Sequence, residues 1–505
     1  MAGFFLYETN CESISVQNVR ITFEKKGLHS PSQFTFGCYT LLLYPKMISQ
    51  KPQFVETEEG FCCAVGTYIY KGLDYAESLS SSLKDFAADR LALDEMYGQY
   101  TLLFFCNGAI TLISDALFAK HIFTDIGNHF FSSSLFAAID ALPKVSLHRN
   151  AVLEKMMTGV IATPDTVVNE IIQLGRHEQE EVNRKKQGVS FVIHPRMSLL
   201  PPHNKGRKES VKAQAAIISE YFKKISPALS SGRVDMGMSA GHDSTLVFAA
   251  AYPYLRDKLH LHTHSTGHVH DREKNAAAAI AGKKKLGVNI VPTPRLDEPD
   301  IDLEGLLNEN LEFFDGRTSH DIGGFSATYR AEYRLKATEG CETSITGVGG
   351  ECLRNHYSVI GKRINSDYFF DEVAFNPSFR KAVSKEVYAN IKEYHLKKVE
   401  KILGCKLHGK VDRLQLRRYY SEFLMPDGQG HVIDAYNLVS HCFSPFLDEH
   451  IIQEAYRGIY YLGNCGEYES AIICELDNEI GKCINSNNGY PFDHIPGKLR
   501  FRRIR

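Results

Sequence analysis

Residues 1–185 alternate between short apolar runs and turns, which is typical of β-strands. The apolar runs are 34–44, 60–70, 98–106, 109–115 and 121–134. The pair Asn107-Gly108 separates two of them and favours a tight hairpin. Helical spacing is seen at 76–92. These patterns predict an α+β domain dominated by sheets.

A polar segment with several prolines, 186–210, has the composition of a linker between domains. After it, short apolar runs alternate with segments of helical spacing. The strand-like runs are 234–238, 259–266 and 288–293, and the helical ones are 212–225, 243–255 and 273–287. This order predicts an α/β domain with a doubly wound parallel sheet in 211–505. Beyond about residue 360 the pattern is mostly helical.

The length, charge and cysteine content of the chain exclude some classes of function. A chain of 505 residues exceeds one ordinary core and predicts at least two domains. The formal net charge of -2 gives no general attraction to nucleic acid or to acidic membranes. The 12 cysteines lack paired metal spacing, the first residues carry no basic stretch of a signal peptide, and the apolar runs are strand-sized. We therefore expect a cytoplasmic protein that binds neither nucleic acid nor membranes.

One tight turn, Ser239-Ala240-Gly241-His242-Asp243-Ser244, lies between a predicted strand and a predicted helix. Two interpretations are open. Asp243 and Ser244 can cap the helix. Alternatively, small residues here let backbone N–H groups approach a phosphate at the carboxyl end of a parallel strand, where the helix N-terminus favours an anion.

A second glycine-rich turn, Thr346-Gly347-Val348-Gly349-Gly350-Glu351, also follows a predicted strand, and Pro445-Phe446-Leu447-Asp448 comes later. Together the three motifs resemble the asparagine synthetase family, which includes β-lactam synthetases and lasso-peptide macrolactam cyclases. The first turn is similar to the PP-loop of the N-type ATP pyrophosphatases, with alanine at one glycine.

The resemblance implies a fold for each part. Residues 1–185 would be a glutaminase-like (class II amidotransferase) domain of the N-terminal-nucleophile hydrolase type. Residues 186–210 would be the linker, and 211–505 an ATP-pyrophosphatase synthetase domain of the adenine nucleotide alpha hydrolase-like fold. The implied reaction activates a carboxylate as an acyl-adenylate, releases pyrophosphate, and forms an amide as an amine displaces AMP.

The resemblance also implies site residues for ATP and Mg²⁺. Asp243 and Glu351 would hold the magnesium ion, because it prefers hard oxygen ligands. The residues expected to bind ATP and its pyrophosphate are Ser239, Gly241, Asp243, Ser244, Ser265, Thr266, Gly267, Gly347 and Gly349.

Several positions depart from the family pattern. Ala2 stands where family glutaminases have a cysteine nucleophile, and their glutamine-binding box is missing near 66–72. Glutamine hydrolysis is therefore not expected, and ammonia or an amine would supply the nitrogen. The first domain would be a remnant or a docking surface for a small-molecule or peptide carboxylate substrate, or for a peptide-processing partner protein.

Further departures lie nearer the chemistry. The family's lysine for adenylation aligns with Asn487, and the glutamate and tyrosine that pair in β-lactam synthetases align with His441 and Val348. His441 is then a candidate base for an incoming amine, with a hydrogen-bonded helix residue as its alternative role. Tyr357 is a second catalytic candidate, with packing as its alternative role.

His260, His262 and His264 would share one face of a strand. Three imidazoles suit zinc, but no fourth ligand is evident, so we expect them to flank the ATP pocket instead. Two hypotheses remain for the whole chain. It is an ATP-dependent amide ligase without glutamine hydrolysis, or a non-catalytic nucleotide-binding relative that acts as an interaction protein.

Overall fold

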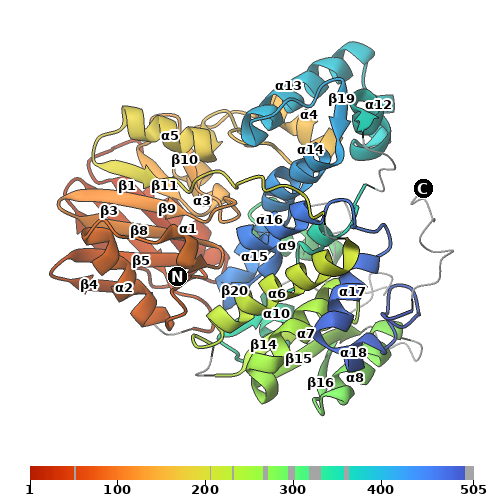
Figure 1. Cartoon of the computed structure of the whole chain (residues 1–505). Helices are drawn as coiled ribbons and strands as arrows, with labels where there is room; N and C mark the ends of the chain where they lie inside the picture. The colour runs from red at the N-terminus through yellow and green to blue at the C-terminus, as the bar shows by residue number, and fades with distance from the viewer. Residues whose placement is uncertain are drawn as a thin grey trace.

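The computed structural model of the chain describes residues 1–49, 53–204, 206–229, 232–265, 271–293, 302–317, 331–357 and 363–494. Figure 1 shows how its helices and strands are arranged. None of the helices in these ranges is both long enough and apolar enough to cross a lipid bilayer.

The apolar runs of the N-terminal part form two sheets. The first has the strand order β12 (Ile171–Gln173), β10 (Phe123–Asp125), β11 (Phe130–Ser132), β1 (Gly3–Glu8), β3 (Tyr39–Tyr44) and β2 (Ser32–Phe36). The second has the order β13 (Val189–Val192), β9 (Ala109–Ser114), β8 (Tyr100–Cys106), β5 (Gly60–Gly66) and β4 (Phe54–Thr57).

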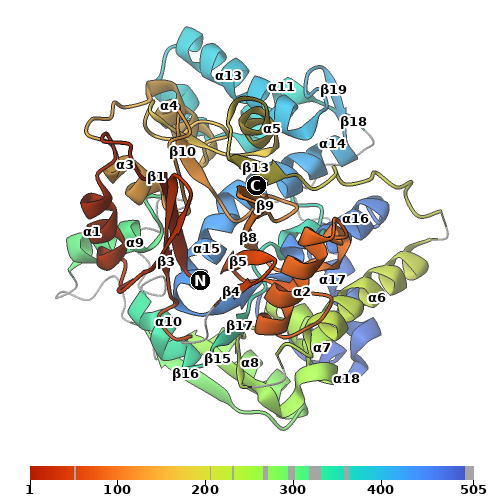
Figure 2. The ribbon, with the colours of Figure 1, turned by 90° about the vertical axis from the view of Figure 1, so that its left-hand side faces the viewer.

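These two sheets stack because their strands are apolar on both faces. In β1, Phe4 and Leu6 pack between the sheets, whereas Phe5 packs on the other side with α1 (Val16–Lys25) and α3 (Leu135–Asp140). Helix α2 (Tyr75–Ala87) covers the second sheet through Leu79 and Leu83. Figure 2 shows the resulting helix, sheet, sheet and helix layers. This is the sheet-dominated α+β arrangement that the pattern predicts.

The predicted division into 1–185, 186–210 and 211–505 stays a prediction, and one strand bears on it. After α5 (Arg176–Lys185), β13 runs parallel to β9 with Val189 opposite Ile110. The N-terminal sheets therefore include residues up to 192, which the pattern assigns to the linker.

A five-stranded parallel sheet organises the C-terminal part, as predicted. Its order is β16 (Val288–Pro292), β15 (Leu259–Ser265), β14 (Val234–Gly237), β17 (Thr343–Ile345) and β20 (His441–Phe443). The chain moves from β14 outward to β16 and then returns to the other side of β14. The strand order therefore reverses between β14 and β17, the position where ligands bind in open sheets of this kind.

Helices cover both faces of this sheet. On one side, α7 (His242–Leu255) and α8 (Arg272–Lys283) connect the outward strands, and α6 (Arg207–Ile225) and α17 (Glu467–Leu476) pack on α7. Helices α10 (Ala331–Thr338) and α15 (Met425–Val439) contact the sheet as well. The short helices α9 (Leu303–Phe313), α16 (Glu449–Arg457) and α18 (Asn478–Gly481) complete this part.

A helical subdomain with its own aromatic core lies above the sheet in Figure 1. It consists of α4 (Arg149–Thr158), α11 (Ser366–Phe369), α12 (Pro377–Ala382), α13 (Lys385–Leu403) and α14 (Arg413–Arg418), with π-helical turns at Phe370–Ala374 and Tyr419–Leu424. Two small strand pairs complete the structure: β18 (Arg363–Asn365) with β19 (Lys410–Asp412), and β6 (Ile69–Tyr70) with β7 (Met96–Tyr97).

A buried ionic cluster joins the N-terminal sheets to the C-terminal part. Asp434 of α15 contacts Lys120 Nζ and His121 Nδ1 at 2.9 Å each, and Arg317 Nη2 at 3.0 Å. Burial by itself would raise the pKa of Asp434, but Lys120 and His121 hold it well below its usual range. The carboxylate is therefore ionised and fully paired.

Replacing Asp434 by Asn leaves the buried Lys120 ammonium without its counter-charge. We expect the free energy of unfolding to fall by about 3–5 kcal/mol, the usual cost of breaking a buried pair. Denaturant titration measures it. The matched control is Glu393→Gln, which breaks the exposed pair of Glu393 and Lys397 and should cost less than about 1 kcal/mol. Equal losses in the two variants would contradict the assignment.

Candidate functional site at the reversal of the strand order

The turn after β14 places the start of α7 against a cavity. Ala240 adopts the left-handed backbone conformation (φ 56°), and Gly241 is the N-cap of the helix. No side chain within the described ranges caps α7, and Asp243 lies inside its first turn. The interpretation of Asp243 and Ser244 as N-caps is therefore wrong. The first N–H groups of the helix are left for another acceptor, and an anion suits them.

The turn after β17 approaches this helix so closely that only glycine fits. A Cβ on Gly347 would lie 3.0 Å from the carbonyl carbon of Asp243 and from the nitrogen of Ser244. A Cβ on Gly350 would lie 2.7 Å from Cβ of Asp243 and nearer still to its carboxylate. These glycines thus allow the second turn to pack against Asp243. Glu351, the residue after Gly350, is thereby brought close to Asp243.

A cavity of about 360 Å³ opens between the two turns. It is lined by Gly237, Met238, Ser239, Asp243, Ser244, His262, Thr263, His264, Glu273, Thr346, Gly347, Val348, Gly349, Glu351 and Gln429. Of the residues expected to bind ATP or Mg²⁺, the structure brings together Ser239, Asp243, Ser244, Gly347, Gly349 and Glu351. The Oγ atoms of Ser239 and Ser244 are 3.0 Å apart.

Three carboxylates and one guanidinium set the charge beside this cavity. Arg354 forms ion pairs with Asp243 and, at 2.5 Å, with the buried Glu469. The hydroxyl of Tyr420 donates to Glu351 Oε2 at 3.1 Å. Burial, reinforced by Glu351 and Glu469 and opposed by Arg354, raises the pKa of Asp243 to about 7. Burial is the largest cause of this raised pKa.

Two of these carboxylates, Asp243 and Glu351, line the cavity and can hold a divalent cation. The described residues contain no group of three or more His, Cys, Asp or Glu side chains that would hold a metal by themselves. Mg²⁺ is commonly bound by one or two carboxylates, with phosphate oxygens and water completing the shell. Asp243 and Glu351 fit that pattern.

The remaining residues expected at the ATP site are placed differently. Gly241 does not line the cavity; a Cβ on it would lie 2.8 Å from Oδ1 of Asn487. Ser486 N donates to Ala240 O at 2.9 Å, so this C-terminal segment packs on the first turn. Ser265 ends β15, next to the cavity residue His264. Thr266 and Gly267 lie outside the described residues.

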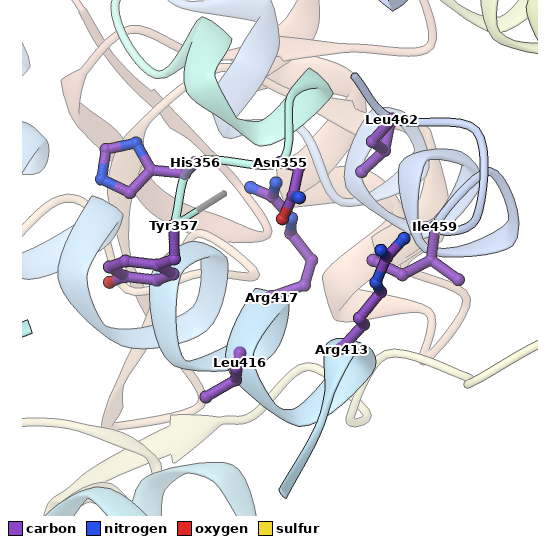
Figure 3. Close-up of a pocket in the computed structure, with 8 residues that line it drawn as sticks. All are labelled: Asn355, His356, Tyr357, Arg413, Leu416, Arg417, Ile459 and Leu462. Atoms are coloured by element: carbon purple, nitrogen blue, oxygen red, sulfur yellow. The ribbon is translucent and has the colours of Figure 1, made fainter. Parts of the chain in front are cut away.

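Tyr357 lines a neighbouring pocket, not this cavity. That pocket is lined by Asn355, His356, Tyr357, Arg413, Leu416, Arg417, Ile459 and Leu462. In Figure 3 the rings of His356 and Tyr357 point away from Asn355 and the two arginines. The Tyr357 ring packs edge-on against Phe369 with centroids 4.8 Å apart. The catalytic prediction for Tyr357 does not fit this position, whereas the packing role does.

His441 lies at the wrong end of its strand for a base. It is the first residue of β20, and the cavity lies beyond the last residues of β14 and β17. Its ring stacks on Tyr75 at 4.0 Å, receives a hydrogen bond from Gln53 Nε2, and is 1% exposed. The structure therefore contradicts a role for His441 on an amine in this cavity.

Sequence reasoning missed several residues of the site. Arg354 and Glu469 carry the ion pairs beside Asp243, and Gln429 reaches the cavity from α15. An arginine three residues after Glu351 was the only local signal. Of the three histidines of β15, two, His262 and His264, line the cavity.

Comparison with known proteins gives little support of its own. No protein-family model and no curated protein matches the chain. Among solved structures, it is similar to the NH3-dependent NAD synthetase of Campylobacter jejuni subsp. jejuni NCTC 11168, with 14% identity, 39% of this chain and 96% of that chain covered, and a TM-score of 0.20.

A second similarity is to the U34-tRNA thiolase NcsA of Methanococcus maripaludis. Identity is 14%, coverage is 63% of this chain and 93% of that chain, and the TM-score is 0.22. Because both TM-scores are this low, neither similarity supports a conclusion about fold or function.

Replacing Gly350 by Ala forces a methyl group into the Asp243 side chain. Because Asp243 is fixed by Arg354, we expect the free energy of unfolding to fall by about 1–3 kcal/mol. Gly282→Ala is the matched control, since a Cβ there meets nothing within 4 Å in α8. That control should leave the stability unchanged or raise it by up to about 1 kcal/mol. A Gly350→Ala protein as stable as the parent would contradict the close approach.

Proposed function

We propose that the chain is an ATP-dependent, AMP-forming carbon–nitrogen ligase that activates a carboxylate as an acyl-adenylate. One observation carries the proposal. The uncapped N-terminus of α7 and the carboxylates of Asp243 and Glu351 line one cavity at the reversal of the strand order. An anion-binding helix end beside a divalent-cation site suits the triphosphate of a nucleotide.

In this proposal the ATP phosphates lie against the α7 N-terminus, Ser239, Ser244 and the Gly347–Gly349 backbone. The bound Mg²⁺ would neutralise charge on the departing pyrophosphate. The adenosine lies toward Ser265 at the end of β15, where Thr266 and Gly267 follow. The substrate carboxylate attacks the α-phosphate, and ammonia or an amine then displaces AMP to form the amide.

The N-terminal part enters the proposal as a glutaminase-like domain without its nucleophile. Cys11 lies in a turn beyond β1, where its thiol contacts Ser13 at 3.1 Å, so it does not occupy the start of that strand. We therefore assign the nitrogen to free ammonia or to an amine of the substrate. The proposal also includes three finer statements. The chain would belong to the asparagine synthetase family, form a lasso-peptide or natural-product macrolactam, and work with a peptide-processing partner.

One observation favours the alternative, a non-catalytic nucleotide-binding protein. Asn487, and no lysine, lies against Gly241 beneath the first turn. A neutral amide there supplies no charge to the adenylation transition state. The two functions differ in their products, because only a ligase releases AMP and pyrophosphate.

The test supplies MgATP with a panel of free amino acids, dicarboxylates and short peptides, and measures AMP and pyrophosphate. We expect release with at least one carboxylate, and a loss of about 100-fold or more in Asp243→Asn and in Glu351→Gln. The control Glu304→Gln changes an exposed residue of α9 and should retain full activity.

Nucleotide binding measured by calorimetry separates the hypotheses. Binding of MgATP without AMP release would support the non-catalytic alternative. Absence of both, or AMP release that survives in Asp243→Asn, would overturn the proposed site.

Replacing Asn487 by Lys restores a cation beside the first turn. We expect the carboxylate-dependent release of pyrophosphate to rise about tenfold, because the ammonium would stabilise charge that develops on the phosphates. The control Asn18→Lys adds the same charge to an exposed position of α1 and should have no effect. An Asn487→Lys variant no faster than the parent would show that Asn487 is not the position that limits adenylation.

A further inference from the structure

A buried Asp–His pair lies in the wall of the same cavity. Asp235 of β14 is fully buried, and its Oδ1 is 2.5 Å from Nδ1 of His262 on β15. Arg334 of α10 donates to the other carboxylate oxygen, Oδ2, at 3.3 Å. The guanidinium of Arg334 lies over the ring of Tyr436 at 4.2 Å. Asp235 is thus held by two side chains, one of which is a cation.

This geometry orients the His262 imidazole. Since a carboxylate accepts the Nδ1–H, the neutral ring keeps its proton on Nδ1 and presents a lone pair on Nε2. Nε2 faces Gly237, where a Cβ would lie 3.4 Å from it, and Gly237 lines the cavity. Among the described residues, nothing forms a hydrogen bond with Nε2. That nitrogen is therefore available to a ligand.

The neighbouring histidines differ from His262. His264 also lines the cavity, edge-on to His262 at 5.4 Å, and burial lowers its pKa to about 4. His260 lies on the same face nearer the start of β15, contacts Arg233 and Glu339, and does not line the cavity. Of the three, only His262 joins a carboxylate on one nitrogen to the cavity on the other.

We propose that His262 is the general base of the amide-forming step and that Asp235 positions it. The proposal rests on the function proposed above. The incoming amine forms a C–N bond with the acyl carbon, and the C–O bond to AMP breaks, with the electron pair leaving on the phosphate oxygen. The proton lost by the nitrogen goes to His262 Nε2 and from there to water in the cavity. The developing imidazolium is stabilised by Asp235.

The proposal replaces the base that the sequence suggested. His441, the sequence candidate, is at the opposite end of the sheet. Val348 lines the cavity without a proton acceptor. In the register of β14 and β15, Gly237 lies opposite His262 and Asp235 lies opposite His260, so the Asp235 side chain reaches His262 diagonally.

The first experiment needs no substrate. Long-range ¹H–¹⁵N correlation spectra of histidine-labelled protein report which ring nitrogen carries the proton, and His262→Gln assigns the signal. We expect the Nδ1–H tautomer, a shift of the Nε2 signal when MgATP is added, and a change toward Nε2–H in Asp235→Asn. An Nε2–H tautomer in the parent protein would overturn the proposal, and so would an Nε2 signal that does not shift when MgATP is added.

The second experiment separates the two half-reactions. With the carboxylate that gives the highest AMP release, His262→Gln should retain ATP–pyrophosphate exchange within about threefold and lose about 100-fold or more of amide formation with ammonia. Hydroxylamine, a nucleophile that is neutral at pH 7, should recover much of the loss. His260→Gln, on the same face of the same strand, should match the parent protein in both half-reactions.

The outcomes also separate this inference from the proposed function. A parent protein without AMP release would refute the ligase and the base of its amide-forming step, while the tautomer measurement would still decide whether Asp235 positions the His262 ring. Normal amide formation in His262→Gln would refute the base and leave the ligase intact. If Asp235→Asn fails to fold, the His262→Gln variant and the spectra of the parent protein decide.

Discussion

The site depends on how closely the turn after β17 approaches the start of α7. Gly347 and Gly350 allow the backbone of the second turn to lie against Asp243, where any side chain would collide. β14 and β17 are adjacent only because the strand order reverses between them. The fold brings two turns that are about a hundred residues apart in the sequence to the same edge of the parallel sheet. Because two glycines lack side chains, these turns pack closely enough to form one site.

The same contact explains the electrostatics. Bringing Asp243, Glu351 and Glu469 together would be costly without cations, because like charges in a partly buried site repel strongly. Arg354 compensates part of this charge by pairing with Asp243 and Glu469. Glu351 stays outside these pairs, held by the hydroxyl of Tyr420 on its longer side chain. Asp243 and Glu351 both line the cavity, and two carboxylates suit a divalent cation whose shell phosphate oxygens and water complete.

The local parts of this picture were predictable from the sequence, and the long-range parts were not. Small residues after apolar runs identified both turns, and β–α alternation identified the parallel sheet. β20 has only three residues and pairs with β17 about a hundred residues away, so no local pattern predicts it. His441 was placed by its spacing to Pro445, which does not reveal that it enters the strand at the far end. Arg354 and Glu469 meet only through tertiary packing.

The three histidines of β15 cannot be told apart by their alternation in the sequence, but their neighbours in the structure differ. Alternation along one strand puts His260, His262 and His264 on the same face, and to that extent they are equivalent. Their partners distinguish them. The buried carboxylate of Asp235 lies opposite His260 in the register but bonds Nδ1 of His262, whereas His260 contacts Arg233 and Glu339. The ring edge of His262 lies against Gly237, and the carboxylate holds its Nδ1 proton. A side chain becomes suited to proton transfer here through its partners across the sheet, which explains why the same residue two positions earlier is not.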